Sequence, residues 1–134
     1  MRDNKYILQL DSDPRNVEVI ESFVQRVVEQ FQLRPDAYGS MLITLTEAVN
    51  NAIIHGNGAD RSKSVRIHLR KKKDHITIRV SDEGGGFDHR SLPDPTQPEN
   101  VRKLGGRGVF LMQQLADDLR FHNNGSTVEI QFNL

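Results

Sequence analysis

The sequence predicts an α/β (α+β) two-layer sandwich, with helices on one face of a mixed, mostly antiparallel sheet. Two long segments with helical periodicity follow a short alternating segment, and a hairpin with strict alternation occupies the middle of the chain. A further helix and further strands close it, in the order β-α-α-β-β-loop-α-β-β. Such an order favours helices on one side of an antiparallel sheet. Because the chain has 134 residues, we expect one domain over 1–134.

The first elements are a strand and two helices. Residues 5–10 alternate apolar and polar side chains, as in a half-buried strand. Asp13 and Pro14 then suit the N-cap and the first position of a helix. Apolar residues continue at helical spacing over 14–33. A second helix is expected from Pro35 to about residue 56.

The remaining elements surround a long irregular segment. Residues 65–69 and residues 76–80 each alternate apolar with polar or charged side chains, which predicts a hairpin with one apolar and one basic face. Residues 88–104 contain three prolines and show no period, which is typical of a functional loop. A helix over about 109–119 and a last strand near 127–132 complete the prediction.

Composition excludes several classes of protein. Lys plus Arg and Asp plus Glu number 18 each, so the formal net charge is zero and overall charge does not recruit the chain to nucleic acid. The absence of cysteine excludes disulfide scaffolds, thiol nucleophiles and cysteine metal sites. The mean hydropathy is −0.57, and no apolar run approaches the ~18 residues of a membrane span. With no signal-peptide pattern at the N-terminus, we expect a cytoplasmic protein without membrane contact.

On the second predicted helix, a carboxylate and an amide lie away from the core stripe. Glu47 points almost opposite to that stripe. Asn51 lies about 40° from Glu47 around the helix, and Asn50 lies on the other flank of Glu47. Ile43 and Ile54 frame the pair, which indicates a second, partly covered surface, whereas an ordinary solvated face is the alternative. A carboxylate and an amide oxygen one turn apart can share a hard cation and a proton-transfer site.

Two glycine clusters follow. Asp82 continues the apolar face of its strand, so its carboxylate needs a hydrogen-bond donor. Gly84 and Gly86 after it allow a ligand to approach the backbone closely, although an Asp-capped glycine turn is the alternative. The second cluster opens a helix and comprises Lys103, Gly105, Gly106, Arg107, Gly108 and Val109. Free backbone N–H groups at such a helix start bind anions, whereas a hinge before an ordinary helix is the alternative.

The order of these motifs resembles the nucleotide-binding boxes of the GHKL ATPase superfamily. The matching segments are residues 47–56, 82–88, 105–108 and 125–127. Within the superfamily, the short chain looks like the anti-sigma factor serine kinases and related anti-sigma regulatory factors, from about residue 6 to 132. The resemblance implies a Bergerat-type ATP-binding fold, in which ATP lies between the helices and a mobile lid at about 88–104.

The resemblance also implies roles for individual residues. Asn51 would coordinate Mg²⁺ that bridges the phosphates, and Glu47 would act as general base or orient the nucleophile. Asp82 would accept a hydrogen bond from the adenine amino group, with support from Thr127 through water. The positions assigned to nucleotide binding are Asn50, Asn51, Asp82, Gly84, Gly86, Lys103, Gly105, Gly106, Arg107, Gly108, Val109 and Thr127.

The function that the resemblance implies is an ATP-binding anti-sigma factor. It would phosphorylate an anti-sigma-factor antagonist on serine or threonine and regulate transcription by partner switching. Its partners would be a sigma factor, that antagonist and a second copy in a homodimer.

Three alternatives stay open. A non-catalytic switch would bind ATP only to regulate a partner. The catalytic fragment of a histidine kinase is a second alternative, although an intact histidine kinase is disfavoured, because residues 14–33 contain no histidine and the chain has no room for a phosphoacceptor hairpin. A nucleic-acid binder could use the basic sheet face, but no aromatic residue interleaves its cations.

Overall fold

Five strands and three α-helices form two layers in the computed structural model, which describes residues 5–84 and 106–134, the first two of the second range by their backbone alone. The strands are β1 (Lys5–Asp11), β2 (Ser64–Lys71), β3 (His75–Ser81), β4 (Asp118–His122) and β5 (Thr127–Asn133). The α-helices are α1 (Glu18–Gln30), α2 (Pro35–Asn51) and α3 (Gly106–Leu115). Short helical turns are η1 (Pro14–Val17), η2 (Ala52–Gly56) and η4 (Asn123–Gly125). The predicted lid at 88–104 lies outside the described residues.

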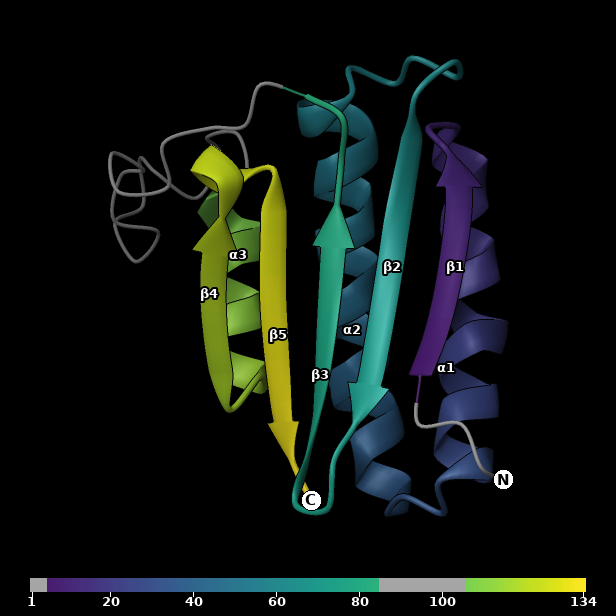
Figure 1. Ribbon diagram of the computed structural model, residues 1–134, viewed down its shortest axis with the longest axis vertical. Helices are drawn as coiled ribbons and strands as arrows, with labels where there is room; N and C mark the ends of the chain where they lie inside the picture. Colours follow the sequence, from purple (N-terminus) through teal and green to yellow (C-terminus); the bar gives the residue numbers. More distant parts are fainter. Residues whose placement is uncertain (1–4, 85–105) are drawn as a thin grey trace.

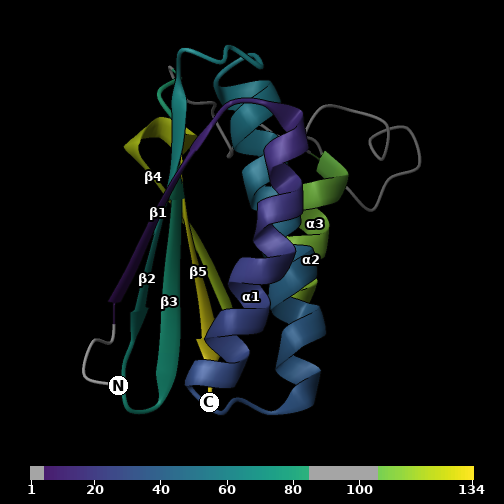
Figure 2. The ribbon, with the colours of Figure 1, turned by 90° about the vertical axis from the view of Figure 1, so that its right-hand side faces the viewer.

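The sheet has the strand order β1-β2-β3-β5-β4, and every neighbouring pair is antiparallel. The helices lie on one face, and the other face is open (Figures 1 and 2). The predicted two-layer α+β class is therefore confirmed. The sheet is antiparallel throughout the described strands rather than mixed.

Alternate side chains of the strands meet the helices to form the core. In β2 and β3 the inward residues are fully buried, as the alternation predicts. Opposite them lie the apolar stripes of α1 and α2, which bury residues such as Ile20, Val24 and Leu45. This packing holds the ends of α2 and β3 in fixed positions, and the candidate site forms there.

The helix starts follow the sequence. Asp13 accepts a hydrogen bond from the Arg15 backbone N–H at 3.0 Å and pairs with the Arg15 guanidinium at 2.8 Å. The hydrogen bonds from Arg15 lower the pKa of Asp13 to about 2. Pro35 begins α2, and η2 prolongs that helix by a π-helical turn to Gly56, where the predicted helix ends.

The last predicted helix is wrong at its end. α3 stops at Leu115, and Leu119 belongs to β4, where it pairs with Ile130 of β5. The backbone N–H of Asp117 donates to Gln131 at 2.9 Å, so pairing with β5 starts where helical spacing alone would extend the helix. Among the described helices, none is both long and apolar enough to cross a membrane.

Candidate active site at the ends of α2 and β3

Glu47 and Asn51 lie under the first turn of α3. Both side chains are half-buried on α2. Gly108 of α3 rests directly on them, since a Cβ at Gly108 would lie 2.7 Å from Glu47 Oε2 and 3.3 Å from Asn51 Nδ2. The structure therefore joins two motifs that are more than fifty residues apart in the sequence. The covered surface is smaller than predicted, because Ile43 and Ile54 are 45% and 39% exposed.

Asp82 lies just beyond the end of β3 and against the end of η2. Its backbone N–H donates to the Ser126 carbonyl at 2.9 Å, and its Oδ1 accepts from the Gly84 backbone N–H at 2.8 Å. The carboxylate packs on Gly56, where a Cβ would meet the carboxyl carbon and both oxygens. Gly84 packs equally closely on the Gly56 carbonyl. These two glycines allow Asp82 to lie beside the helix that carries Glu47 and Asn51.

The Asp82 carboxylate has acceptor capacity to spare. Burial raises its pKa above the ordinary value, while the Gly84 N–H and the positive charge of Lys63 oppose that rise. Within the part of the chain that the structure describes, it accepts the single hydrogen bond from Gly84. Because a carboxylate offers about four acceptor positions, a ligand N–H group fits this half-buried anion.

Asn57 fixes the loop around Asp82, a role that sequence reasoning missed. It is 2% exposed, and its Nδ2 donates to Ser12 Oγ at 2.7 Å and to the Ser64 carbonyl at 3.0 Å. Its Oδ1 accepts from the Glu83 backbone N–H at 2.7 Å. One amide thus ties β1, β2 and the end of β3 together. Asn57-Gly58 is an ordinary turn pair in the sequence, which carries no signal of this burial.

Glu83 reinforces the same loop from the other side. Its Oε2 accepts from the backbone N–H of Ser64, the first residue of β2. The two residues that follow Asp82 are therefore anchored, Glu83 to β2 and Asn57, and Gly84 to the Asp82 carboxylate. This arrangement presets the direction of the Asp82 side chain.

Thr127 supports the neighbouring residue rather than Asp82 directly. It is 6% exposed and pairs with Ser81 across β3 and β5. The two hydroxyl oxygens are 3.0 Å apart, and Asn123 Nδ2 donates to Thr127 Oγ1 at 3.3 Å. The network holds the end of β3, from which Asp82 projects.

The other predicted positions are placed as follows. Asn50 is half-buried on α2 and Val109 is buried in α3. The backbones of Gly106 and Arg107 form the start of α3. Gly86, Lys103 and Gly105 lie outside the described residues.

The described side chains near the site do not by themselves form a metal-binding group. Over residues 5–84 and 108–134, no three His, Asp or Glu side chains converge into a metal-binding group. Partial burial lowers the pKa of His55, which favours its neutral imidazole. A cation here would need oxygen ligands from a bound molecule, with Asn51 as the amide ligand nearest to α3.

Comparison with known proteins agrees with this geometry. Residues 10–132 match the profile of the Histidine kinase-like ATPase domain. The chain is similar to Serine-protein kinase RsbW of Oceanobacillus iheyensis, with 28% identity over 122 residues, 87% of this chain and 77% of the relative. The corresponding protein of Bacillus subtilis is 29% identical over 128 residues, 90% of this chain and 80% of the relative. That of Listeria innocua is 24% identical over 132 residues, or 93% and 84%. The match to the domain profile spans nearly the whole chain, which therefore belongs to the histidine kinase-like, GHKL-type ATPase domain family.

Proposed function

We propose that this chain binds Mg–ATP at the ends of α2 and β3 and transfers the γ-phosphoryl group to a serine or threonine of a partner protein. The observation that carries the proposal is the placement of Asp82 against Gly56. It sets an acceptor for adenine at the end of the helical segment that carries Glu47 and Asn51. Family membership supports ATP binding, and the relatives named as serine-protein kinases support phosphotransfer.

Asp82 is the proposed adenine anchor. Its carboxylate accepts from the exocyclic amino group, which adds a second donor to a half-buried anion that accepts only from the Gly84 N–H among the described residues. Charge-assisted hydrogen bonds of this kind are worth ~1.5–3 kcal/mol. Gly84 keeps the backbone close to the base, and Gly86 is proposed to do the same.

The start of α3 is the proposed phosphate site. The first backbone N–H groups of a helix have no acceptor within the helix and attract anions. Gly108 brings this turn to Asn51, whose amide oxygen is the proposed protein ligand of Mg²⁺. Mg²⁺ would neutralise phosphate charge during transfer. Lys103 and Arg107 are proposed to add positive charge, and residues 88–104 to cover the phosphates.

Glu47 is the proposed catalytic residue. It is half-buried one helical turn before Asn51, so its carboxylate lies at the phosphate end of the site. There it accepts or orients the hydroxyl proton of the attacking serine, a role that typically contributes about 10²–10⁴-fold to the rate. Phosphoryl transfer otherwise depends on positioning and charge, which the two glycine clusters and Asn51 provide.

The test is incubation with radiolabelled ATP and candidate anti-sigma-factor antagonist domains, followed by mapping of the phosphorylated residue. Glu47→Gln keeps the size and one hydrogen-bonding oxygen, so ATP affinity should persist while phosphotransfer falls at least about 100-fold. Asn51→Ala should weaken Mg–ATP binding and abolish transfer together. Glu29→Gln on the exposed surface of α1 makes the same charge change and should leave both intact.

The outcomes separate the kinase from a non-catalytic switch. Phosphoserine or phosphothreonine on the antagonist, lost in Glu47→Gln, supports the kinase. Transfer at the parent rate in Glu47→Gln contradicts its assignment as base. If the parent chain releases a sigma factor on binding ATP but phosphorylates nothing, the regulatory switch replaces the kinase.

A further inference from the structure

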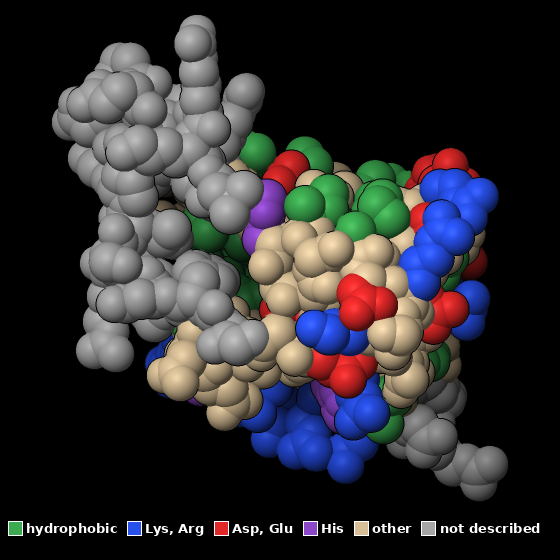
Figure 3. Space-filling model, turned by 90° about the horizontal axis from the view of Figure 1, so that it is seen from above, with side chains coloured by type: hydrophobic (Ala, Val, Ile, Leu, Met, Phe, Trp, Pro, Cys, Tyr) green, Lys and Arg blue, Asp and Glu red, His purple; other side chains and the backbone are tan. Residues whose placement is uncertain are grey.

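The open face of the sheet carries its charges in cross-strand rows, on the side opposite to the helices and the candidate active site. One row runs Lys5, Arg70, Thr77, Gln131 and Asp118 from β1 to β4. The next row runs Ile7, His68, Arg79, Glu129 and Arg120. Seen from above, Lys and Arg side chains gather along the lower edge of the molecule, which is this face (Figure 3).

The acids of this face are already paired on the half formed by β3, β5 and β4. Arg79 contacts Glu129 at 2.7 Å, and Arg120 contacts Asp118 at 2.8 Å. His122 lies 3.3 Å from the same Glu129 oxygen. Glu129 and Asp118 are therefore satisfied by cations of their own half.

The half formed by β1 and β2 has one acid on the open face, Asp11 at the end of β1, and no cation of this half forms an ion pair with it among the described residues. Across the described residues, Lys5, Arg66 and Arg70 form no ion pair, and Arg66 reaches only the Gln9 amide oxygen at 3.5 Å. Lys5 and Arg70 stand directly opposite each other in the register. Like charges in that relation destabilise a sheet, so an external anion would relieve a cost already present in the fold.

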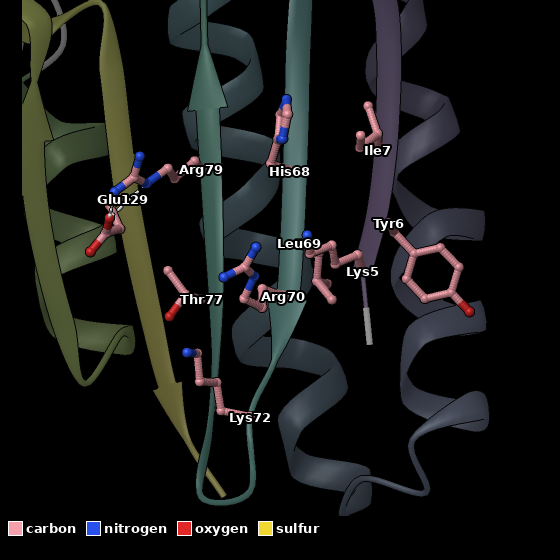
Figure 4. Close-up of a pocket in the computed structure, with 10 residues that line it drawn as sticks. All are labelled: Lys5, Tyr6, Ile7, His68, Leu69, Arg70, Lys72, Thr77, Arg79 and Glu129. Carbon is pink, nitrogen blue, oxygen red and sulfur yellow. Dashed lines mark hydrogen bonds and ion pairs between the residues drawn. The ribbon is translucent and has the colours of Figure 1, made fainter. Parts of the chain in front are cut away.

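Lys5 and Arg70 border a groove of about 580 Å³. Lys5, Arg70 and Lys72 supply its unpaired positive charge (Figure 4). Arg79 and Glu129 also line the groove and pair with each other, so their charges offset. Ile7 is 68% exposed at its rim and is the most exposed large apolar side chain among the described residues. The groove therefore combines unpaired positive charge with one apolar contact.

We propose that this groove docks an acidic protein segment, whose carboxylates contact Lys5, Arg70 and Lys72 and whose apolar side chain covers Ile7. A nucleic acid suits the surface less well, because the Tyr6 ring packs against Phe23 and Phe31 on the helix side and offers the groove no stacking platform. A second copy of the chain would bring one basic face against another, which is repulsive. Docking in this groove does not depend on nucleotide binding.

The test uses the full chain and two short fluorescein-labelled peptides, one of glutamate and leucine and one of glutamine and leucine, measured by anisotropy at low salt. Lys5→Gln/Arg70→Gln removes two charges from the groove. Arg26→Gln/Arg34→Gln removes two exposed charges from the helix side, so both double variants have the same net charge. Because an exposed ion pair is worth up to ~1 kcal/mol, we expect the groove variant to bind the glutamate peptide about tenfold more weakly. The control variant should bind like the parent.

Two further readouts complete the test. Ile7→Ser should weaken binding of the glutamate–leucine peptide but not of a glutamate–serine peptide, and added salt should weaken binding of both. Equal affinity for the glutamate and glutamine peptides, or equal losses in the two double variants, overturns the proposal. A labelled single-stranded oligonucleotide that binds more tightly than the glutamate peptide, and loses affinity in Lys5→Gln/Arg70→Gln, also overturns it. So does a dimer in sedimentation whose stability changes in Lys5→Gln/Arg70→Gln but not in the control variant, if neither peptide binds.

Discussion

Replacing Gly56 by alanine should displace the Asp82 carboxylate and weaken ATP binding. The added methyl group would lie 2.8 Å from Asp82 Oδ1 and closer still to Oδ2 and the carboxyl carbon. Since ordinary contacts need about 3.5 Å, the carboxylate must retreat by roughly 1 Å. The backbone of Gly56 lies outside the left-handed region, so the substitution acts through this contact and not through strain.

The magnitude follows from the contacts that the retreat disturbs. It breaks the 2.8 Å hydrogen bond from the Gly84 N–H, worth ~0.5–1.5 kcal/mol, and forces Asp82 from its rotamer at ~0.5–1.5 kcal/mol. A displaced Asp82 carboxylate is also no longer aligned to accept a hydrogen bond from the adenine amino group. We expect Gly56→Ala to lower ATP affinity by about tenfold or more and to destabilise the chain by ~1–3 kcal/mol.

Two other glycines provide matched controls for titration calorimetry and urea unfolding. A Cβ added at Gly39 in α2 would have nothing within 4 Å, so Gly39→Ala should stabilise the chain by up to ~1 kcal/mol without changing ATP affinity. Gly58 is equally open but has a φ of +62°, so Gly58→Ala should destabilise by ~1 kcal/mol and also leave affinity unchanged. A folded Gly56→Ala protein that binds ATP as tightly as Gly39→Ala would refute the reasoning.

Four further predictions concern the same site. Burial raises the pKa of Asp82, so ionisation of its carboxyl group destabilises the folded state at pH values above that pKa. Asp82→Asn should therefore stabilise the nucleotide-free chain at pH 7, as measured by urea unfolding, while weakening ATP binding. Because the pKa of Asp82 is raised, the ATP affinity of the parent should begin to fall on acidification at a pH above the pKa of an ordinary aspartate. In calorimetry, the ATP affinity of Asp82→Asn should not show this pH dependence. Asn57→Ala leaves buried partners unsatisfied and should cost ~2–4 kcal/mol in urea unfolding; a cost below ~1 kcal/mol would contradict its anchoring role. Gly108→Ala should keep the fold, since alanine is a better helix former than glycine in α3. The added methyl group should displace the Glu47 side chain and slow phosphotransfer at least about tenfold, and an unchanged rate would contradict the placement of Glu47.

The sequence predicts local features of this fold well. Strict alternation placed Ile67 and Ile78 inward on the hairpin, and Asp13 with Pro14 marked a helix start that the structure confirms. Helical angles separated Glu47 from the core stripe of α2, and the structure places it half-buried beside α3. These features depend on neighbours within a few residues, where periodicity and capping act.

Tertiary contacts determine the features that the sequence did not predict. Leu119 suits a helix by its spacing, but pairing with Ile130 places it in β4. Asn57 resembles any turn asparagine until three distant segments close around its amide. The contact of Gly56 with Asp82 likewise depends on how η2 packs on the end of β3, which no local pattern encodes.

The most direct test of the ATP site is calorimetric titration of Mg–ATP into the parent chain and the Asp82→Ala variant, with folding of both verified by urea unfolding. Loss of one charge-assisted hydrogen bond of ~1.5–3 kcal/mol predicts that Asp82→Ala binds ATP about tenfold to a hundredfold more weakly. A folded Asp82→Ala variant that binds ATP with the parent affinity would contradict the account.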